Sequence, residues 1–244
     1  MPTDKELKLA VLIDADNIPY ANVKAMMEEI AKYGTPTFKR IYGDWTKPTT
    51  AGWKSVLLQN AITPIQQYSY TSGKNATDSA MIIDAMDILY TGRVDGFCIV
   101  SSDSDFTRLA TRLREAGMKV IGIGEKKTPE PFITACDKFI YIEILSHDSA
   151  PDVKEKRAKR DSLQKVDKRV INLIKSSIND VADESGWAFL GEVGTLILKK
   201  QPNFDARNYG FRKLLQMMKS IDDIEVDERQ RENGGTRHVY VRVK

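Results

Sequence analysis

Residues 96–106 read GFCIVSSDSDF, an apolar run followed directly by serines and aspartates. A helical pattern follows from Thr107 to Ala116. A strand that ends in acids and turns into a helix places carboxylates at the carboxyl edge of a parallel sheet, where open α/β sheets bind ligands. Because serine and aspartate also cap helices, one acid at this place would mean little on its own.

A similar apolar run followed by acids occurs near the beginning of the chain. Residues 9–17 read LAVLIDADN, so a second apolar run ends in acids, at Asp14 and Asp16. Between and beyond these runs, strand patterns at 9–13, 37–42, 63–67, 97–100, 119–123 and 139–142 alternate with helical patterns at 22–33, 52–60, 77–90, 106–116 and 131–135. This alternation predicts a parallel sheet covered by helices on both faces. Right-handed crossovers then bring the carboxyl ends of the strands to one edge.

The composition is that of a water-soluble globular protein. Hydrophobic residues make up 41% and charged residues 29% of the 244 residues, which are ordinary values. No apolar run approaches the roughly 20 residues needed to cross a bilayer, and the first residues form no signal-peptide core. Two cysteines and two histidines argue against a disulfide scaffold and against structural zinc. We therefore expect a cytoplasmic protein with no membrane contact.

Charge is distributed unevenly along the chain. Residues 1–150 hold 17 Lys and Arg against 19 Asp and Glu, whereas residues 151–244 hold 20 against 15. The basic excess in the second part hints at a polyanionic partner, although an ordinary solvated surface gives the same pattern. We expect a first domain at 1–147, a basic linker at 148–162 and a second domain at 163–244.

The second domain has the pattern of a winged helix-turn-helix. Helical patterns near 166–178, 192–200 and 205–218 precede alternating segments at 224–226 and 239–243, with a polar, Gly-containing turn between the last two. About 80 residues are enough for an independent small domain.

Several carboxylates at one sheet edge would repel one another and raise each other's pKa. A hard divalent cation, Mg²⁺ or Mn²⁺, relieves that repulsion because it prefers oxygen ligands, and it can turn a bound water into a nucleophile. The expected ligands are Asp14, Asp78 and Asp103, followed by Asp105. Asn17 would hydrogen-bond the scissile phosphate or a water on the metal.

Each of these acids also has a structural explanation. Asp78 lies in the first turn of a predicted helix, where the helix dipole alone favours an acid. Asp103 and Asp105 can serve only as caps. Asp84 lies near the helix face of Asp78 but is displaced from it. Lys74 precedes Asp78 closely enough to meet a phosphate, or it is a solvated loop lysine.

Three motifs together resemble the NYN domain of the PIN-like nuclease superfamily, in its bacterial LabA-like branch. They are VLIDADNIP at 11–19, KNATD at 74–78 with Asp84 in the following helix, and VSSDSDF at 100–106. The resemblance covers residues 8 to about 145. It implies a three-layer α/β/α fold and a metal-dependent acidic site associated with RNA cleavage. The matching site residues are Asp14, Asn17, Asp78, Asp84, Asp103 and Asp105.

Residues 163–244 resemble the OST-HTH domain, also called LOTUS. The match is carried by LGEVG at 190–194 and by the pattern from Phe204 to Met218, with the hairpin behind it. The resemblance implies a winged-helix module that binds RNA or a protein partner. The basic residues expected on RNA in this domain are Lys199, Lys200, Arg207, Arg212, Lys213, Arg229, Arg231 and Arg237.

These observations favour a metal-dependent endoribonuclease that acts on single-stranded RNA. The resemblance to PIN-like enzymes implies products with 5′-phosphate and 3′-hydroxyl ends. A catalytically inactive RNA-binding or adaptor protein is the main alternative. A phosphatase that uses Asp14 as its nucleophile is a third possibility, since Asp14-Ala15-Asp16 resembles the DxD motif of haloacid-dehalogenase-type phosphatases, in which the first aspartate is the nucleophile and the second a general acid. Asn17 departs from that pattern, and no downstream lysine motif accompanies it.

Overall fold

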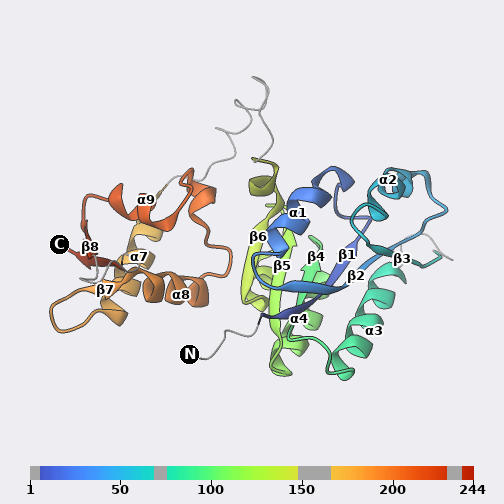
Figure 1. The fold of residues 1–244 in the computed structure, drawn as a ribbon, viewed down its shortest axis with the longest axis horizontal. Coiled ribbons are helices and arrows are strands. Elements are labelled where there is room, and N and C mark those ends of the chain that lie inside the picture. Colours follow the sequence, from blue (N-terminus) through green and yellow to red (C-terminus); the bar gives the residue numbers. More distant parts are fainter. Residues whose placement is uncertain (1–5, 69–75, 148–165, 230–237) are drawn as a thin grey trace, which may run out of the picture. The chain divides into compact units, whose positions relative to one another are not determined.

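The computed structural model describes residues 6–68, 76–147, 166–229 and 238–244 (Figure 1). The chain divides into two compact units, residues 1–150 and 151–244. Three of the expectations above lie outside the described residues: the basic linker, Lys74 in the first unit, and Arg231 with Arg237 in the second.

A six-stranded sheet forms the middle of the first unit (Figure 1). Its strands are β1 (Lys8–Asp14), β2 (Thr35–Gly43), β3 (Thr63–Gln66), β4 (Gly96–Val100), β5 (Lys119–Gly124) and β6 (Lys138–Tyr141). They lie in the order β3-β2-β1-β4-β5-β6, and every neighbouring pair is parallel. The predicted parallel sheet is confirmed. The strand order reverses direction between β1 and β4, which is the place where a sheet of this type opens a crevice for a ligand.

Helices cover both faces of this sheet because alternate residues of its strands point to opposite sides. On one face, α1 (Val23–Ile30) and α2 (Lys54–Leu57) pack against Val11 and Ile13 of β1. On the other face, α3 (Ala76–Tyr90), α4 (Thr107–Glu115) and α5 (Glu130–Ala135) pack against Ala10 and Leu12. Since β1 is buried on both sides, its sequence is a continuous apolar run. The PIN-like three-layer α/β/α architecture follows from this arrangement.

Short 3₁₀ helices join several of these elements: η1 (Tyr20–Asn22), η2 (Pro48–Trp53), η3 (Ser104–Phe106) and η4 (Ile142–His147). The predicted helix at 52–60 is instead η2 followed by the single turn of α2. Pro48 starts η2, as its fixed φ favours a first helical position. Gly52 lies against Tyr20, where an added Cβ would come within 2.4 Å of a ring carbon. The chain here is shaped by that close packing rather than by helical periodicity.

The second unit is a small helical domain with a three-stranded sheet. Its elements are α7 (Lys168–Val181), β7 (Ala188–Phe189), α8 (Leu190–Lys200), η5 (Ala206–Tyr209), α9 (Leu214–Lys219), β8 (Ile224–Arg229) and β9 (His238–Val243). The strands pair antiparallel in the order β7-β9-β8. Ile174, Val193 and Met217 meet in its core. This is the predicted winged helix-turn-helix, except that the helix expected at 205–218 is broken after η5 by Gly210, which has a φ of 87°.

Within the parts of the chain that the structure describes, no helix combines the length and the apolar character needed to span a membrane.

Candidate functional site

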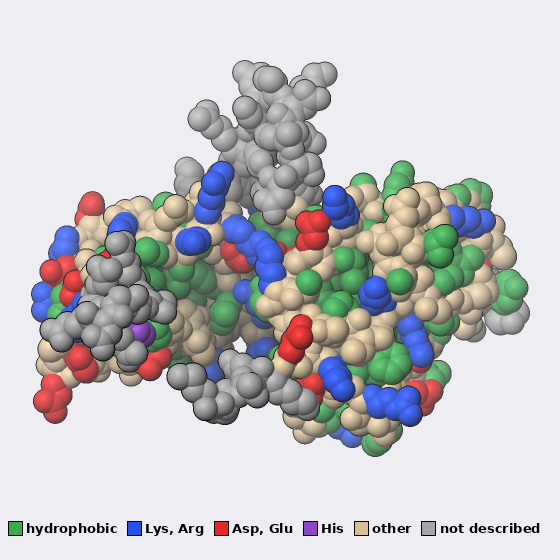
Figure 2. Space-filling model, viewed as in Figure 1, with side chains coloured by type: hydrophobic (Ala, Val, Ile, Leu, Met, Phe, Trp, Pro, Cys, Tyr) green, Lys and Arg blue, Asp and Glu red, His purple; other side chains and the backbone are tan. Residues whose placement is uncertain are grey.

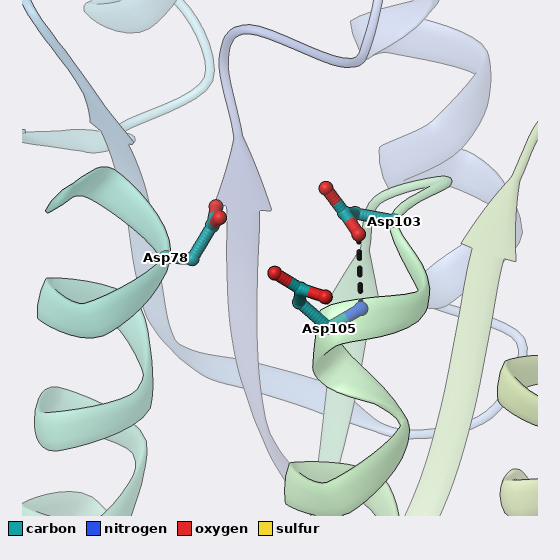
Figure 3. Close-up of side chains that lie close together, drawn as sticks. All are labelled: Asp78, Asp103 and Asp105. Atoms are coloured by element: carbon teal, nitrogen blue, oxygen red, sulfur yellow. Dashed lines mark hydrogen bonds between the residues drawn. The ribbon is translucent and has the colours of Figure 1, made fainter. Parts of the chain in front are cut away.

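Three carboxylates meet at the sheet edge where the strand order reverses between β1 and β4. Asp78 comes from the first turn of α3, and Asp103 and Asp105 come from the turn that follows β4. One oxygen from each of the three side chains lies within 4.8 Å of the others. Figure 3 shows Asp78 extending from its helix toward the other two side chains. We call these three residues the acidic group.

The turn after β4 is held by its own side chains. Asp103 is the N-cap of η3, and its Oδ1 accepts a hydrogen bond of 2.9 Å from the backbone N–H of Asp105 (Figure 3). The capping explanation is therefore correct for Asp103. It does not exclude a ligand role, because capping engages one carboxylate oxygen. The cap also directs the side chain of Asp105 toward the same space.

Asp14 is the last residue of β1 and is buried, with only 1% of its surface exposed. It lies close enough to the acidic group for its charge to act on Asp78. Its Oδ2 accepts hydrogen bonds from Asn17 Nδ2 at 2.5 Å and from Ser101 Oγ at 2.8 Å, and its Oδ1 accepts one from the N–H of Asp16 at 3.1 Å. Burial raises the pKa of Asp14, whereas the hydrogen bonds from Asn17 and Ser101 oppose that shift. The structure thus brings the amide of Asn17 to Asp14, whereas the sequence predicted a contact of Asn17 with a phosphate or a metal-bound water.

Ser101 is a site residue that the sequence did not reveal. Its buried hydroxyl donates to Asp14 and accepts a hydrogen bond of 3.1 Å from the N–H of Asp103. It therefore links the end of β1 to the turn after β4. The signal was present in the sequence, as a serine between a buried strand and two acids, but helix capping explained it equally well.

Repulsion among the acids is visible in the electrostatics of Asp78. Its pKa rises from 3.8 to about 6, first because of burial and then because of the charges of Asp14, Asp103 and Asp105. A divalent cation would relieve this repulsion. Oxygen ligands held at about 2.1 Å from one Mg²⁺ lie about 3 to 4 Å from each other, which is compatible with the spacing within the acidic group. The donors are carboxylate oxygens, the kind that hard cations prefer.

Asp84 does not belong to the acidic group. Its two carboxylate oxygens accept hydrogen bonds from the Arg40 guanidinium and from the Tyr42 hydroxyl, both on β2. Six residues along a helix amount to about one and two-thirds turns, so Asp84 leaves α3 in a different direction from Asp78. We infer that Asp84 anchors α3 to β2 rather than holding a metal.

This inference gives a testable distinction. We expect Asp84→Asn to lower the free energy of unfolding by about 1–2 kcal/mol, because Arg40 and Tyr42 lose a charged partner in a partly buried place. Its affinity for Mn²⁺ should stay within about threefold, since the carboxylate of Asp84 binds Arg40 and Tyr42 and is therefore neither a ligand nor a group that orients one. Urea unfolding and a calorimetric Mn²⁺ titration measure the two effects. Asp87→Asn, on the exposed side of the same helix, is the matched control, and loss of Mn²⁺ binding in Asp84→Asn alone would restore Asp84 as a ligand.

The basic residues expected on RNA fall into two classes in the second unit. Lys200 pairs with Asp180 at 2.6 Å, and Arg207 pairs with Asp205 at 2.7 Å. Lys199 at the end of α8 and Arg212 with Lys213 just before α9 are exposed, as is the paired Lys200. Arg229 pairs with Asp227 and lies over the rings of Trp187 and Tyr240. Figure 2 shows basic and acidic side chains interspersed on the visible face.

Solved structures resemble parts of the chain. One is the crystal structure of a protein of unknown function, VPA0982, from Vibrio parahaemolyticus RIMD 2210633, with 22% identity over 58% of this chain and 96% of that chain and a TM-score of 0.48. Another is an uncharacterized protein from locus NE0665 of Nitrosomonas europaea, with 29% identity over 40% of this chain and 83% of that chain and a TM-score of 0.30. A third, residues 175–257 of a protein from Chromobacterium violaceum, has 38% identity over 33% of this chain and 85% of that chain and a TM-score of 0.27.

Family comparison identifies both units. No curated protein matches the chain. The family model of the NYN domain, a PIN-like nuclease domain, matches residues 8–143, which is more than half of the chain. The family model of the OST-HTH/LOTUS domain matches residues 161–236. The chain therefore belongs to the NYN domain family and carries an OST-HTH/LOTUS domain after its NYN domain.

Proposed function

We propose that this protein is a divalent-metal-dependent endoribonuclease of the LabA-like branch that cleaves single-stranded RNA. The observation that carries the proposal is the acidic group, because three carboxylates converge at the strand-order reversal of a PIN-like nuclease domain. The OST-HTH/LOTUS domain, which suggests RNA binding, supports RNA as the substrate.

Asp78, Asp103 and Asp105 are the residues proposed to hold the cation, Mg²⁺ or Mn²⁺. When bound, such a cation polarises a phosphate oxygen and makes water a better nucleophile. Asp14, from the first motif, contributes a buried negative charge that raises the pKa of Asp78. We propose that this charge adds to the attraction of the site for a cation. Asn17 donates its amide N–H to Asp14, so we assign it to positioning Asp14 rather than to contacting the phosphate.

In the proposed reaction, water adds to phosphorus on the side opposite the departing oxygen. The bond to the 3′-oxygen breaks, and the products carry a 5′-phosphate and a 3′-hydroxyl group. The protein's contribution is to orient the phosphodiester by charge and position, which is where most catalysis of phosphoryl transfer arises.

The second unit is proposed to retain the RNA through its exposed basic side chains. Lys199, Arg212 and Lys213 are the residues proposed to meet phosphates, because Lys200 and Arg207 already have carboxylate partners. Phosphate contacts of this kind give affinity without sequence selectivity. Lys74 and Arg237 remain predictions, and a protein ligand of this domain is the alternative.

The phosphatase alternative is disfavoured by the surroundings of Asp14. An aspartate nucleophile needs one carboxylate oxygen within reach of the substrate. Asp14 is 1% exposed, and both of its oxygens accept hydrogen bonds. It is therefore poorly suited to attack a phosphate ester.

The proposal is tested by incubating the purified protein with end-labelled single-stranded RNA in Mn²⁺, in Mg²⁺ and in chelator. We expect internal cleavage with 5′-phosphate ends in one or both metals and none in chelator, because the acidic group repels phosphate until a cation is bound. Binding of intact RNA without cleavage in any divalent metal would instead identify a catalytically inactive RNA-binding protein.

A further inference from the structure

We propose that Tyr20, Trp45 and Tyr68 form a stacking surface for unpaired bases of the RNA strand that leads into the acidic group. We call these three residues the aromatic row. This inference rests on the proposed action on single-stranded RNA and adds a recognition site to it.

The aromatic row lies along the same sheet edge as the acidic group. Tyr20 begins η1 after β1, Trp45 follows the end of β2 by two residues, and Tyr68 follows the end of β3 by two residues. These three strands are parallel neighbours, and β1 also adjoins β4, which leads to Asp103. Neighbouring strands lie about 4.8 Å apart, so the ends of β1, β2 and β3 lie within about 14 Å of the end of β4 across the sheet. A few nucleotides can cover that length.

Two of the rings are unusually open to solvent. Tyr20 is 48% exposed and Tyr68 is 52% exposed. Single exposed aromatic residues need no explanation, but here the two follow β1 and β3, the strands on either side of β2, which leads to Trp45. Trp45 is partly buried and packs on the core with one side. Part of the ring surface of the row therefore remains exposed to solvent.

Hydrogen bonds hold the middle of the row in place. The indole N–H of Trp45 donates to the Ile65 carbonyl at 3.0 Å, and its backbone N–H donates to Gln66 Oε1 at 2.9 Å. Gln66 in turn donates to Asp44 Oδ1 at 3.0 Å. Asp44 is a buried acid at the end of β2 whose Oδ1 also accepts from the Thr46 hydroxyl at 2.6 Å. Its carboxylate is therefore engaged in fixing the turn that carries Trp45.

The position of Tyr20 is also prepared by its surroundings. Its ring lies over Gly52 of η2, where a Cβ would come within 2.4 Å of Tyr20 Cε1. A side chain at position 52 would push the ring away. The absence of a side chain there lets Tyr20 lie close to the backbone of η2 while about half of its surface stays open.

The chemistry of this surface fits a single RNA strand. Aromatic rings accept unpaired bases of any sequence by stacking, and nearby positive charge follows the backbone. Lys47, before η2, and Lys54, at the start of α2, are both exposed on the segment that joins β2 to β3. A duplex keeps its bases inside and cannot stack on the row, so the surface selects for unpaired RNA.

The test is a binding experiment on the full chain in chelator, where cleavage is not expected. Fluorescently labelled single-stranded RNA is compared with the same strand made abasic at successive positions, which keeps the phosphates and removes the bases. The variants are Tyr20→Ala and Tyr68→Ala, with Tyr20→Phe and Tyr68→Phe as matched controls that keep the rings. Removal of one stacked base is expected to weaken binding about tenfold.

We expect each Ala variant to bind base-bearing RNA about tenfold more weakly and each Phe variant to bind within about twofold of the unsubstituted protein. The effects of an Ala substitution and of the abasic position should not add, because both remove the same contact. In a Trp187→Phe background, the tryptophan emission should change when RNA binds. This change would report on Trp45, because the other remaining tryptophan, Trp53, is buried.

Equal binding by the Ala and unsubstituted proteins, or fully additive losses, would overturn the aromatic row as a base-binding surface. Because no step requires cleavage, this outcome is separable from the fate of the proposed nuclease. If the losses of RNA affinity were non-additive but the protein cleaved no RNA, the aromatic row would be supported as a base-binding surface and the proposed nuclease activity would be wrong. If the protein cleaved RNA but the losses of affinity were additive, the nuclease proposal would be supported and the aromatic row would be wrong.

Discussion

Asp103→Asn is expected to reduce metal-dependent RNA cleavage to below about 1% and to weaken Mn²⁺ binding by at least about 100-fold, because changes even outside a metal's direct ligands commonly cost 10–100-fold. The fold should survive. The side-chain oxygen of asparagine can still accept the hydrogen bond that Asp103 receives from the N–H of Asp105, since asparagine caps helices about as well as aspartate. The substitution therefore removes the charge of a proposed metal ligand while keeping the turn.

The matched control for this experiment is Asp87→Asn. It makes the same chemical change on the exposed side of α3, so any effect of net charge on RNA binding appears in both variants. Calorimetry with Mn²⁺, an RNA cleavage time course and thermal unfolding should be measured on both. If Asp103→Asn kept more than about a tenth of the cleavage rate with an unchanged melting temperature, the acidic group would not be the catalytic site.

The sequence was sufficient to predict the parts of the site that depend on local order. Asp14 and Asp103 each follow a buried strand, and parallel strands must deliver their carboxyl ends to one edge. Asp105 came with Asp103 because the two share one turn. The fold class followed from the same alternation of strands and helices, since a parallel sheet needs a helix in each crossover.

The partners of those acids could not be predicted, because they come from distant elements. The pairing of Asp84 with Arg40 and Tyr42 joins residues 44 and 42 positions apart, and helical periodicity placed Asp84 only near Asp78. Ser101 reaches Asp14 across 87 positions. Such contacts depend on the register between strands and on the rotation of α3 about its axis, neither of which a single sequence displays. The same is true of Gln66, which links Asp44 to Trp45.

Asp78→Asn should stabilise the metal-free protein at pH 7 while it destroys the metal site. The pKa of Asp78 is about 6 in the folded state against 3.8 ordinarily, so folding at pH 7 carries the cost of a charge that is partly buried and that the other acids repel. The full shift would correspond to about 3 kcal/mol. Asp78 is only partly buried, and the helix dipole favours an acid in the first turn, so we expect about 1–2 kcal/mol.

The pH dependence of this effect has a definite sign. Because the folded-state pKa is raised, the penalty is complete above pH 6, shrinks as the pH falls from 6 toward 3.8, and is absent below 3.8. The advantage of Asp78→Asn over the unsubstituted protein should therefore be largest at pH 7 and should vanish near pH 4. Urea unfolding in chelator at several pH values measures it, and at pH 7 the melting temperature should rise by about 2–8 °C.

Addition of Mn²⁺ should reverse the order of stability. A cation that binds only the folded state adds about 2.7 kcal/mol at 100 times its dissociation constant, which exceeds the 1–2 kcal/mol gained by the substitution. The unsubstituted protein should gain that stability, and Asp78→Asn should gain little. Asp87→Asn should follow the unsubstituted protein under both conditions. If Asp78→Asn were less stable than the unsubstituted protein in chelator, the charge of Asp78 would carry no net cost in the folded state. If Mn²⁺ stabilised both proteins equally, Asp78 would not be a ligand. A crossing of the two stabilities would instead show that a divalent cation compensates the charge of Asp78, which burial and the neighbouring acids make unfavourable in the metal-free protein.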